Sequence, residues 1–398
     1  MKIIPELRFP EFVKEEGWIL EKVDNLIYKY SEKSDYSNQY PVLTSSREGI
    51  MFQRDYYNDR DVASKDNKGY NVVPRGYFTY RHMSDDLIFK FNINNICDRG
   101  IVSTLYPVFK VRENKILPYF FQQKLNEGPE FKRFAYAQKQ GGSRTYMYLN
   151  KLKDLGIYIP KLQEQQKIAS CLSSLDELIA GHIDKLEALK DHKKALIQDL
   201  FPSAGETVPK IRFPGFEDDG EWMEKKLLEI AENFDSKRIP ITSNQREKGN
   251  IPYYGASGII DYVKGYIFDE ELLLISEDGA NLIARVYPIA FSITGKTWVN
   301  NHAHVLKFEN WYTQVLVEKY LNFKNIEDFL TGMAQPKLNR GKLDIIPIPL
   351  PKNRKEEQKI ATCLWAVDEL ITAQTEKIEQ LQEHKKGLML GLFPKIEG

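Results

Sequence analysis

Residues 164–202 read EQQKIASCLSSLDELIAGHIDKLEALKDHKKALIQDLFP and return almost unchanged as residues 356–394, which read EEQKIATCLWAVDELITAQTEKIEQLQEHKKGLMLGLFP. No insertion separates the two copies, and 21 of the 39 positions are identical. Self-similarity at a fixed interval defines the architecture of a chain. Because only two copies occur, the sequence predicts a duplicated molecule and not a solenoid.

Apolar residues recur at helical spacing through both copies, which is typical of a coiled-coil seam. Polar residues interrupt the stripe at equivalent places, His182 with Gln374 and Lys193 with Lys385, where they can fix register and choice of partner. A helix of this length spans roughly 50 Å at about 1.5 Å per residue and could act as a spacer. An ordinary hairpin or dimerisation coil explains the helices alone equally well. The residues expected to pair the helices or dock a partner are Ile168, Leu172, Leu175, Ile179, His182, Leu186, Leu189, Ile360, Leu364, Val367, Ile371, Gln374, Ile378 and Leu381.

A second repeat lies upstream of each helical stretch. Leu-Arg-Phe-Pro at residues 7–10 is followed by Trp18, and Ile-Arg-Phe-Pro at residues 211–214 is followed by Trp222 at the same spacing. The repeated unit is therefore a leader, a globular domain and a long helix. We expect domains over residues 1–160 and 205–352, and long helices within 161–204 and 353–398, in a pseudo-two-fold arrangement.

The composition is that of an ordinary globular protein. Its 398 residues are 42% hydrophobic, which suffices for two or three cores. The apolar runs are too short to span a bilayer and the first residues lack a signal-peptide core, so a cytoplasmic protein with no membrane partner is expected. Three cysteines, Cys97, Cys171 and Cys363, show no metal-ligand spacing and imply no disulfide framework.

The formal net charge is zero, which argues against a protein that holds DNA by bulk electrostatics. Lys and Arg outnumber Asp and Glu by 25 to 20 in residues 1–160, but are outnumbered by 21 to 17 in residues 205–350. Any nucleic-acid surface must therefore be local and helped by a partner.

Between leader and helix, both halves show the pattern of a mixed α/β domain with many short strands. In the first half we expect strands at 39–44, 69–80, 87–91, 104–111 and 156–159, and a helix from Pro118 to about residue 134. In the second half we expect strands near 251–254, 266–268, 272–276, 290–292 and 304–308, and a helix over about 313–321. The fold class predicted is α/β, mixed α+β.

Each half also contains a loop that combines glycine, amide and cation, at residues 138–146 and 331–337. Glycine lets the backbone approach a phosphate, Lys and Arg neutralise it, and Gln can pair with an adenine edge. A solvated connection ahead of a strand explains either loop as well.

None of the candidate catalytic or metal-binding motifs in the sequence meets the requirements of its class. Residues 290–297 fit a loosened phosphate-loop pattern, but alanine stands at the required first glycine and no helix is expected to follow. His302 and His304 would share a strand face, yet no third metal ligand lies nearby in sequence, so a polar sheet face or a DNA-contacting edge is the better interpretation. Acidic clusters at 217–219 and 277–278 resemble turns more than a two-metal nuclease centre. The sequence therefore predicts no catalytic residue and no metal site.

The order of leader, variable α/β domain and Gln-Lys-Ile-Ala helix ending in Leu-Phe-Pro, followed by the whole unit again, resembles the specificity subunit of type I restriction-modification enzymes. The resemblance covers nearly the full chain and includes residues 279–282 and 298–305, which are similar to the family's second target-recognition domain. It implies two target-recognition domains that each read one half of a split DNA site. It also implies long helices that pair as an antiparallel coiled coil and set the gap.

The resemblance implies partners as well. These would be double-stranded DNA, two methyltransferase (modification) subunits docked on the helices, and restriction/translocase subunits. S-adenosylmethionine, ATP and Mg would be held by the partner subunits, and this chain would be a non-catalytic reader that itself binds no cofactor. The alternatives are a duplicated coiled-coil interaction scaffold without DNA specificity and, third, a stand-alone nuclease.

Residues expected to contact DNA are polar, amide and cationic side chains of the turns and loops. Tyr80 and Tyr146 are candidates for stacking on sugar or base, although core packing is the commoner fate of a tyrosine. In the first domain the set is Ser45, Ser46, Arg47, Tyr80, Arg81, Lys139, Gln140, Ser143, Arg144 and Tyr146. In the second domain it is Tyr254, Ser257, Asn281, Lys296, Asn301, His302, Gln335 and Lys337.

Overall fold

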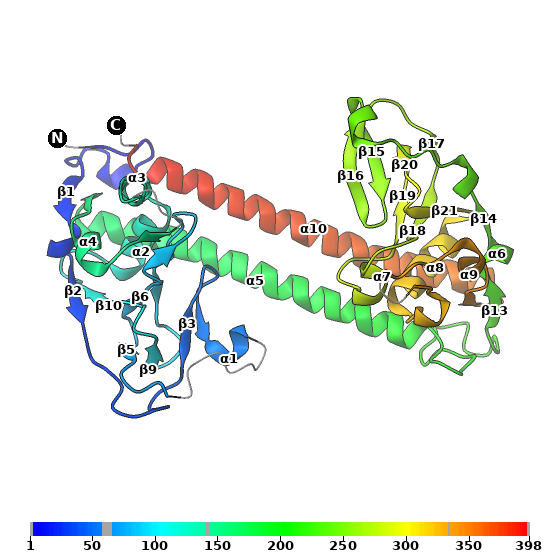
Figure 1. The fold of residues 1–398 in the computed structure, drawn as a ribbon, viewed down its shortest axis with the longest axis horizontal. Helices are drawn as coiled ribbons and strands as arrows, with labels where there is room; N and C mark the ends of the chain where they lie inside the picture. Colours follow the sequence, from blue (N-terminus) through cyan, green and yellow to red (C-terminus); the bar gives the residue numbers. More distant parts are fainter. Residues whose placement is uncertain (1–2, 58–65, 140–143, 333–334, 396–398) are drawn as a thin grey trace. The chain divides into compact units, whose positions relative to one another are not determined.

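The computed structural model describes residues 3–57, 66–139, 144–332 and 335–395, and the chain divides into two compact units. The first unit consists of residues 1–182 together with 377–398, and the second consists of residues 183–376 (Figure 1). Each unit therefore contains part of both long helices, α5 (Leu162–Leu200) and α10 (Arg354–Leu392). No helix in the described ranges combines the length and apolarity needed to cross a membrane.

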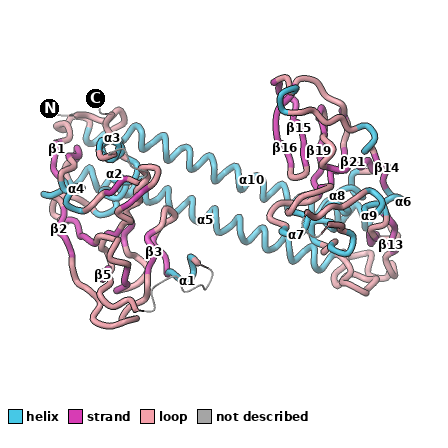
Figure 2. The backbone as a smooth tube through the Cα atoms, viewed as in Figure 1, coloured by secondary structure: helices cyan, strands magenta, loops and turns pink. Residues whose placement is uncertain are grey.

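The long helices pair in an antiparallel sense within each unit, as predicted. In the first unit the start of α5 and the end of α10 share one hydrophobic core, and in the second unit the end of α5 and the start of α10 do so (Figure 2). None of the predicted seam residues is exposed: nine are buried, and Leu175, His182, Leu186, Leu189 and Ile371 are partly buried. The polar seam lysines form equivalent interhelical ion pairs, Lys385 with Asp176 and Lys193 with Asp368. These pairs tie each seam to one register.

A four-stranded antiparallel sheet with one strand order forms the frame of both units. In the first unit the order is β2 (Ile27–Tyr30), β10 (Val108–Val111), β6 (Phe78–Thr79), β8 (Asn92–Ile93). In the second it is β14 (Ala231–Asn233), β21 (Ala303–Phe308), β18 (Leu272–Ser276), β19 (Ala290–Ile293). Every residue of β18 is buried, because strands lie on both of its edges and the apolar run packs on both faces. The units thus share topology although their interiors share little sequence.

Helices and a leader strand complete each frame. In the first unit these are α2 (Pro118–Glu127), α3 (Pro129–Ala137), α4 (Leu149–Lys153) and the pair β1 (Ile19–Lys22) with β12 (Gly156–Ile159). In the second they are α6 (Leu227–Ile230), α8 (Trp311–Phe323), α9 (Arg340–Asp344) and the pair β13 (Met223–Lys226) with β22 (Pro347–Leu350). In both units the strand that follows the leader pairs with the strand that precedes the long helix.

The remaining elements differ between the units. The first adds β3 (Leu43–Ser45) paired with β4 (Ile50–Phe52), β5 (Asn71–Pro74) paired with β9 (Arg99–Val102), β7 (Met83–Ser84) paired with β11 (Thr145–Tyr146), and α1 (Gln53–Tyr56). The second adds a sheet of β16 (Gly258–Val263), β15 (Lys248–Gly255), β20 (Lys296–Val299) and β17 (Phe268–Asp269), and α7 (Asn281–Ala284).

The leader repeat has a structural cause. Arg8 donates from Nε and Nη2 to the two carboxylate oxygens of Glu164 at 2.8 and 2.7 Å, and Arg212 makes the same two bonds to Glu356 at 2.8 and 2.6 Å. All four side chains are buried. The indole of Trp18 adds a third bond to Glu164 at 3.2 Å. Each leader is therefore clamped to the start of the long helix of its own unit.

Three expected elements are wrong. The strand expected at 69–80 is two strands, β5 and β6, which lie in different sheets and are separated by a turn at Gly76, whose φ is 80°. The single helix from Pro118 breaks at Gly128, whose backbone is extended, and a new helix starts at Pro129. A Cβ on Gly128 would lie 2.3 Å from the Lys124 carbonyl oxygen, so this close approach requires glycine. Residues 87–91 form no strand: Leu87 has a φ of 67°, and Phe89 and Phe91 are buried in the core from an irregular segment.

Candidate nucleic-acid interface

A two-stranded ribbon of the first unit gathers several predicted contact residues. Strand β7 pairs with β11, with Met83 opposite Tyr146. Arg144, at the start of β11, donates to Asp85 at 2.9 Å, and Arg81 precedes β7 as an exposed side chain. An antiparallel ribbon is narrow enough to enter the major groove of DNA.

Stacked aromatic rings lie along this ribbon. Tyr146 is 43% and Tyr148 is 53% exposed, and their rings are nearly parallel at 12° with centroids 5.8 Å apart. The buried ring of His82 stacks on Tyr148 at 4.9 Å. Tyr148 and His82 were not predicted. The spacing Tyr-x-Tyr, which places both rings on one face of an extended segment, was the available signal.

A depression beside the ribbon brings three more predicted residues together with Arg81. It has a volume of about 330 Å³, and its lining includes Ser45, Ser46, Arg47 and Arg81. Ser45 is buried and accepts a hydrogen bond from Asn92 at 2.9 Å, so its hydroxyl serves the fold and not the surface. Exposed tyrosines that were not predicted, Tyr56 and Tyr57, line the same depression.

Arg47 forms an ion pair with Asp86 at 2.6 Å on the rim of the ribbon. The hydrogen bond from Arg47, with a second from Ser84, lowers the pKa of Asp86 to about 2. The carboxylate is therefore ionised at neutral pH and holds the guanidinium in place.

The prediction that Tyr80 contacts DNA is wrong. Its side chain is fully buried and its hydroxyl donates to the Met147 carbonyl oxygen at 2.8 Å. Burial raises the pKa of this phenol. Tyr80 is a core residue and cannot stack on DNA in this structure. Of the other predicted residues in this unit, Lys139 is exposed at the end of α3, whereas Gln140 and Ser143 lie outside the described residues.

In the second unit, three loops meet at the end of the main sheet. The backbone N–H of Glu277 donates to the His302 carbonyl at 2.9 Å, and that of Leu338 donates to the Glu277 carbonyl at 2.8 Å. The Asn300 N–H donates to the Tyr254 carbonyl at 3.0 Å, which adds the β15–β16 turn. The predicted residues that these contacts bring together are Tyr254, Ser257, Asn301, His302, Gln335 and Lys337.

A buried polar network fixes these loops. Arg238 donates to Glu277 at 2.7 Å and to the Ala303 carbonyl at 2.8 Å. His304 places Nδ1 2.6 Å from Asp235 and Nε2 2.7 Å from the Leu338 carbonyl. Burial opposes ionisation of Asp235, but the hydrogen bonds to His304 and the Val305 N–H outweigh it and lower the pKa. Arg238 and Asp235 were missed, because they act through contacts distant in sequence.

The histidine pair does not form a metal site. His302 is half-exposed and contacts Asp278 at 2.8 Å, whereas His304 is buried in β21. Within the described ranges, no cluster of three or more His, Cys, Asp or Glu residues is arranged to hold a metal ion. The three cysteines are free thiols.

Two other predicted residues of the second unit use their side chains elsewhere. Asn281 uses its amide to close its own loop, with bonds to the backbone of Tyr287 at 2.9 and 3.0 Å. Its segment is joined to the loop cluster, because the Gly279 N–H donates to the Pro336 carbonyl at 3.1 Å. Lys296 lies over the ring of Tyr266 at 4.9 Å, at the end of β20 opposite Asn300.

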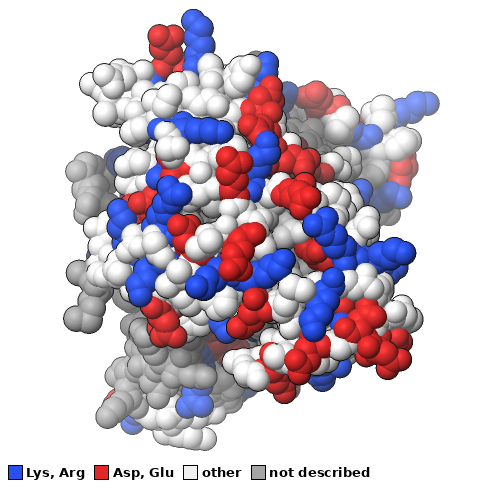
Figure 3. All heavy atoms as spheres, turned by 90° about the vertical axis from the view of Figure 1, so that its right-hand side faces the viewer, with Lys and Arg blue, Asp and Glu red and all other residues white. Residues whose placement is uncertain are grey.

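Carboxylates accompany the cations at both candidate surfaces. Arg47 pairs with Asp86 and Arg144 with Asp85 in the first unit, and Lys337 pairs with Glu277 at 3.2 Å in the second. On the face shown in Figure 3, blue and red side chains alternate and no broad basic patch is visible. Such surfaces can form directional hydrogen bonds to base edges but attract phosphates only weakly.

Comparison with known protein families identifies the class of protein to which this chain belongs. The family described as "Type I restriction modification DNA specificity domain" matches residues 24–190 and again residues 219–383. The chain belongs to this family, with one match in each half.

Individual relatives agree. The chain is 42% identical over 131 residues to a Haemophilus influenzae protein whose name describes a type I restriction enzyme specificity subunit, although the match spans only 33% of each chain. It is 24% identical over 320 residues, 73% of each chain, to the type I restriction enzyme MjaVIII specificity subunit of Methanocaldococcus jannaschii.

Solved structures share the fold. The S subunit of a type I restriction-modification system from M. genitalium matches 99% of this chain with a TM-score of 0.65 at 15% identity. A chain from a study of complex assembly and conformational transition of the type I R-M system matches 97% with a TM-score of 0.52 at 16% identity. At these identities the likeness concerns the fold.

Proposed function

We propose that this chain is the DNA sequence-recognition subunit of a type I restriction-modification complex, and that each unit reads one half of a bipartite target. One observation supports this proposal most strongly. The same sheet order and the same Arg–Glu clamp occur in both units, whereas the surface loops of the two units differ. A frame that is duplicated while its surface diverges suits a molecule that reads two different short sequences at a fixed separation.

The first unit reads its half-site with the ribbon β7–β11. Arg81 and Arg144 offer the planar donors that recognise guanine edges. Tyr146 and Tyr148 offer exposed rings that contact thymine methyl groups or stack on sugars.

The second unit reads its half-site with the loop cluster of Asn301, His302, Gln335 and Lys337. The amides of Asn301 and Gln335 can each pair with an adenine edge through two hydrogen bonds. Lys337 and His302 supply cationic or donor groups beside them, each already oriented by a carboxylate.

The paired helices set the separation and carry the partners. Glu177 and Leu178 of α5 are identical to Glu369 and Leu370 of α10, and all four side chains are exposed. The units also share a groove beside the leader strand and the start of the long helix, about 540 Å³ in the first unit and 520 Å³ in the second. A surface presented twice suits two copies of one partner, the modification subunit.

The chemistry belongs to these partners. S-adenosylmethionine would be bound by the modification subunits, and ATP and Mg would be bound by restriction subunits. The chain contributes recognition and spacing and assigns none of its own residues to catalysis.

The test is site-specific adenine methylation by the chain mixed with its modification partner, accompanied by a footprint on target DNA. We expect methylation only with both proteins present, and two protected patches separated by an unprotected gap. Methylation or cleavage by the isolated chain would refute the non-catalytic role. A complex that forms without any footprint would support a coiled-coil scaffold instead.

A further inference from the structure

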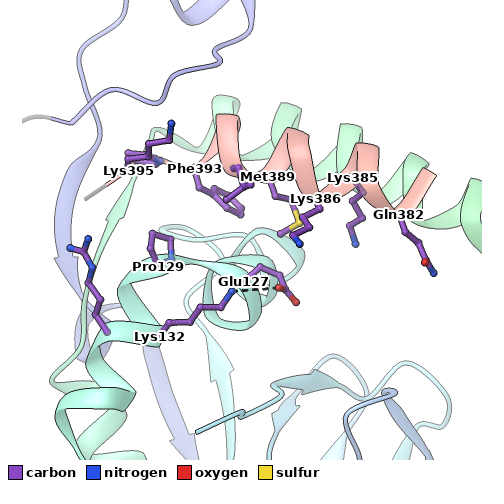
Figure 4. Close-up of a pocket in the computed structure, with 12 residues that line it drawn as sticks. Glu127, Pro129, Lys132, Gln382, Lys385, Lys386, Met389, Phe393 and Lys395 are labelled. Atoms are coloured by element: carbon purple, nitrogen blue, oxygen red, sulfur yellow. Dashed lines mark ion pairs between the residues drawn. The ribbon is translucent and has the colours of Figure 1, made fainter. Parts of the chain in front are cut away.

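An apolar groove in the first unit lies outside both the reading surface and the repeated docking surfaces. It runs between α3 and the last turns of α10 and has a volume of about 560 Å³ (Figure 4). Its apolar lining is Pro129, Met389, Leu390, Phe393 and Pro394, and Leu390 is 62% exposed. These residues form one contiguous apolar lining, and contiguous apolar surface, unlike a single exposed side chain, marks interaction sites.

The rim of the groove is basic. Its cations are Lys132, Arg133, Lys385, Lys386 and Lys395, against the single carboxylate of Glu127. Two of these cations are already paired, Lys385 with Asp176 and Lys395 with Glu6 at 2.6 Å. Glu127 accepts from Lys90 at 3.0 Å and lies 3.9 Å from Lys132, so the cations around the groove still outnumber these three carboxylates. In a chain with zero net charge, this is a local excess of positive charge around an apolar floor.

The second unit does not repeat this combination. On α5 the residue equivalent to Leu390 is Gln198. The basic wall formed by α3 also has no helical counterpart, since α8 is followed by the short turn Glu327–Phe329, which carries Glu327 and Asp328. The groove is therefore a feature of one unit and does not serve the two-fold repeated machinery.

We propose that this groove binds an acidic amphipathic helix of a partner protein, one helix per chain. An apolar stripe of the helix would cover Leu390, Met389 and Phe393, as in other helix-in-groove complexes. Carboxylates on its flanks would meet Lys132, Lys386 and their neighbours, and this complementarity selects acidic over basic partners. A DNA backbone is a poor occupant, because it would leave the exposed side chain of Leu390 facing phosphates. The proposal does not depend on DNA recognition.

The probe is a displayed library of helical peptides with a fixed apolar stripe and flanking positions randomised among Glu, Gln and Lys, selected on the full-length chain. We expect recovered peptides to be acidic on both flanks and to bind one per chain in native mass spectrometry. Leu390→Gln, which installs the residue of the other copy, and Lys386→Glu should each lower their affinity by about tenfold or more. The matched control Lys194→Glu changes the equivalent position of α5 and should leave affinity unchanged.

Other occupants give other results, and each would overturn the proposal. Recovery of Lys-flanked or uncharged peptides would show that the basic rim does not select acidic partners. Equal binding by the groove variants would place the peptides elsewhere. Displacement of the peptides by duplex DNA would identify a phosphate site, and loss of self-association in Leu390→Gln would identify a contact between copies. Site-specific adenine methylation by the same variants reports on DNA recognition separately.

Discussion

The loops proposed to read DNA in the first unit and those proposed in the second occupy the same place in the same frame, yet they share almost no chemistry. In the first unit the ribbon β7–β11 presents arginines and stacked tyrosines. In the second unit an isolated bridge between Asp278 and Lys337 takes the ribbon's place and presents a lysine, a histidine and amides. The Arg–Glu pairs of the two leader clamps, by contrast, make the same two hydrogen bonds.

This difference separates the residues that maintain the fold from those that give each unit its own specificity. Both units use a buried Arg–Glu clamp to join the leader to the long helix. Neither unit needs the other's loops. Variants of the frame should therefore act alike in both units, and variants of the loops should act on one half-site only.

The largest effect is expected from breaking a clamp. Arg8→Ala leaves the buried carboxylate of Glu164 without its ion-pair partner, and Arg212→Ala does the same to Glu356. Each change should lower the free energy of unfolding of its own unit by about 3–5 kcal/mol. Hydrogen exchange should show lost protection in β1 and β12 for the first variant, and in β13 and β22 for the second. Equal loss in both units from one variant would contradict two separate clamps.

Removing reading side chains should cost less and act on one half-site. We expect Tyr146→Ala to weaken DNA binding by about 1–3 kcal/mol through the half-site of the first unit, and Lys337→Ala to act similarly through the other. Competition with duplexes altered in one half measures this. Tyr136→Ala, which removes a tyrosine that is 71% exposed on α3, is the control and should leave binding unchanged.

The indoles of the two leaders differ in one bond. Trp18 donates to Glu164, whereas the buried Trp222 N–H finds no acceptor among the described residues. Replacement by Phe removes ring contacts in both, but only Trp18→Phe also breaks a hydrogen bond to a charged group. We expect Trp18→Phe to be more destabilising than Trp222→Phe by about 1–2 kcal/mol in urea unfolding. Equal effects would mean that the hydrogen bond from Trp18 to Glu164 does not contribute to stability.

The smallest effect is a pH dependence confined to the second unit. Because the pKa of Asp235 is held below its ordinary value of 3.8, ionised Asp235 stabilises the fold fully above about pH 4. That contribution is lost as the pH falls through the lowered value. In Asp235→Asn, the hydrogen-exchange protection of residues 276–303 should therefore depend less on pH in the acidic range. An unchanged acid limb would show that another group controls it.

Much of the frame follows from the sequence because it depends on periodicity. The heptad stripe predicted the helix-pairing seam, and the apolar runs at 156–159 and 272–276 predicted strands β12 and β18 with their observed bounds. The helix break at Gly128 depends on a close backbone approach that periodicity does not reveal, since a Cβ there would lie 2.3 Å from the Lys124 carbonyl oxygen. The irregular segment at 87–91 is buried through packing and not through a strand.

The reading surface is less predictable, because exposure decides it and exposure depends on partners distant in sequence. Tyr80 and Tyr146 look alike in sequence, yet one is fully buried and the other lies open. Arg238 and Asp235 orient the loops of the second unit from more than 30 residues away in sequence, and only the fold shows it.

The central claim is that each unit independently reads one half of a split target. Its most direct test is the sequencing of methylated adenines in DNA modified by the complex, for the natural chain, for Arg81→Ala and for His302→Ala. We predict a bipartite motif with an unspecified gap, relaxed in one half by the first variant and in the other half by the second. A continuous motif, or relaxation of both halves by either variant, would contradict the account.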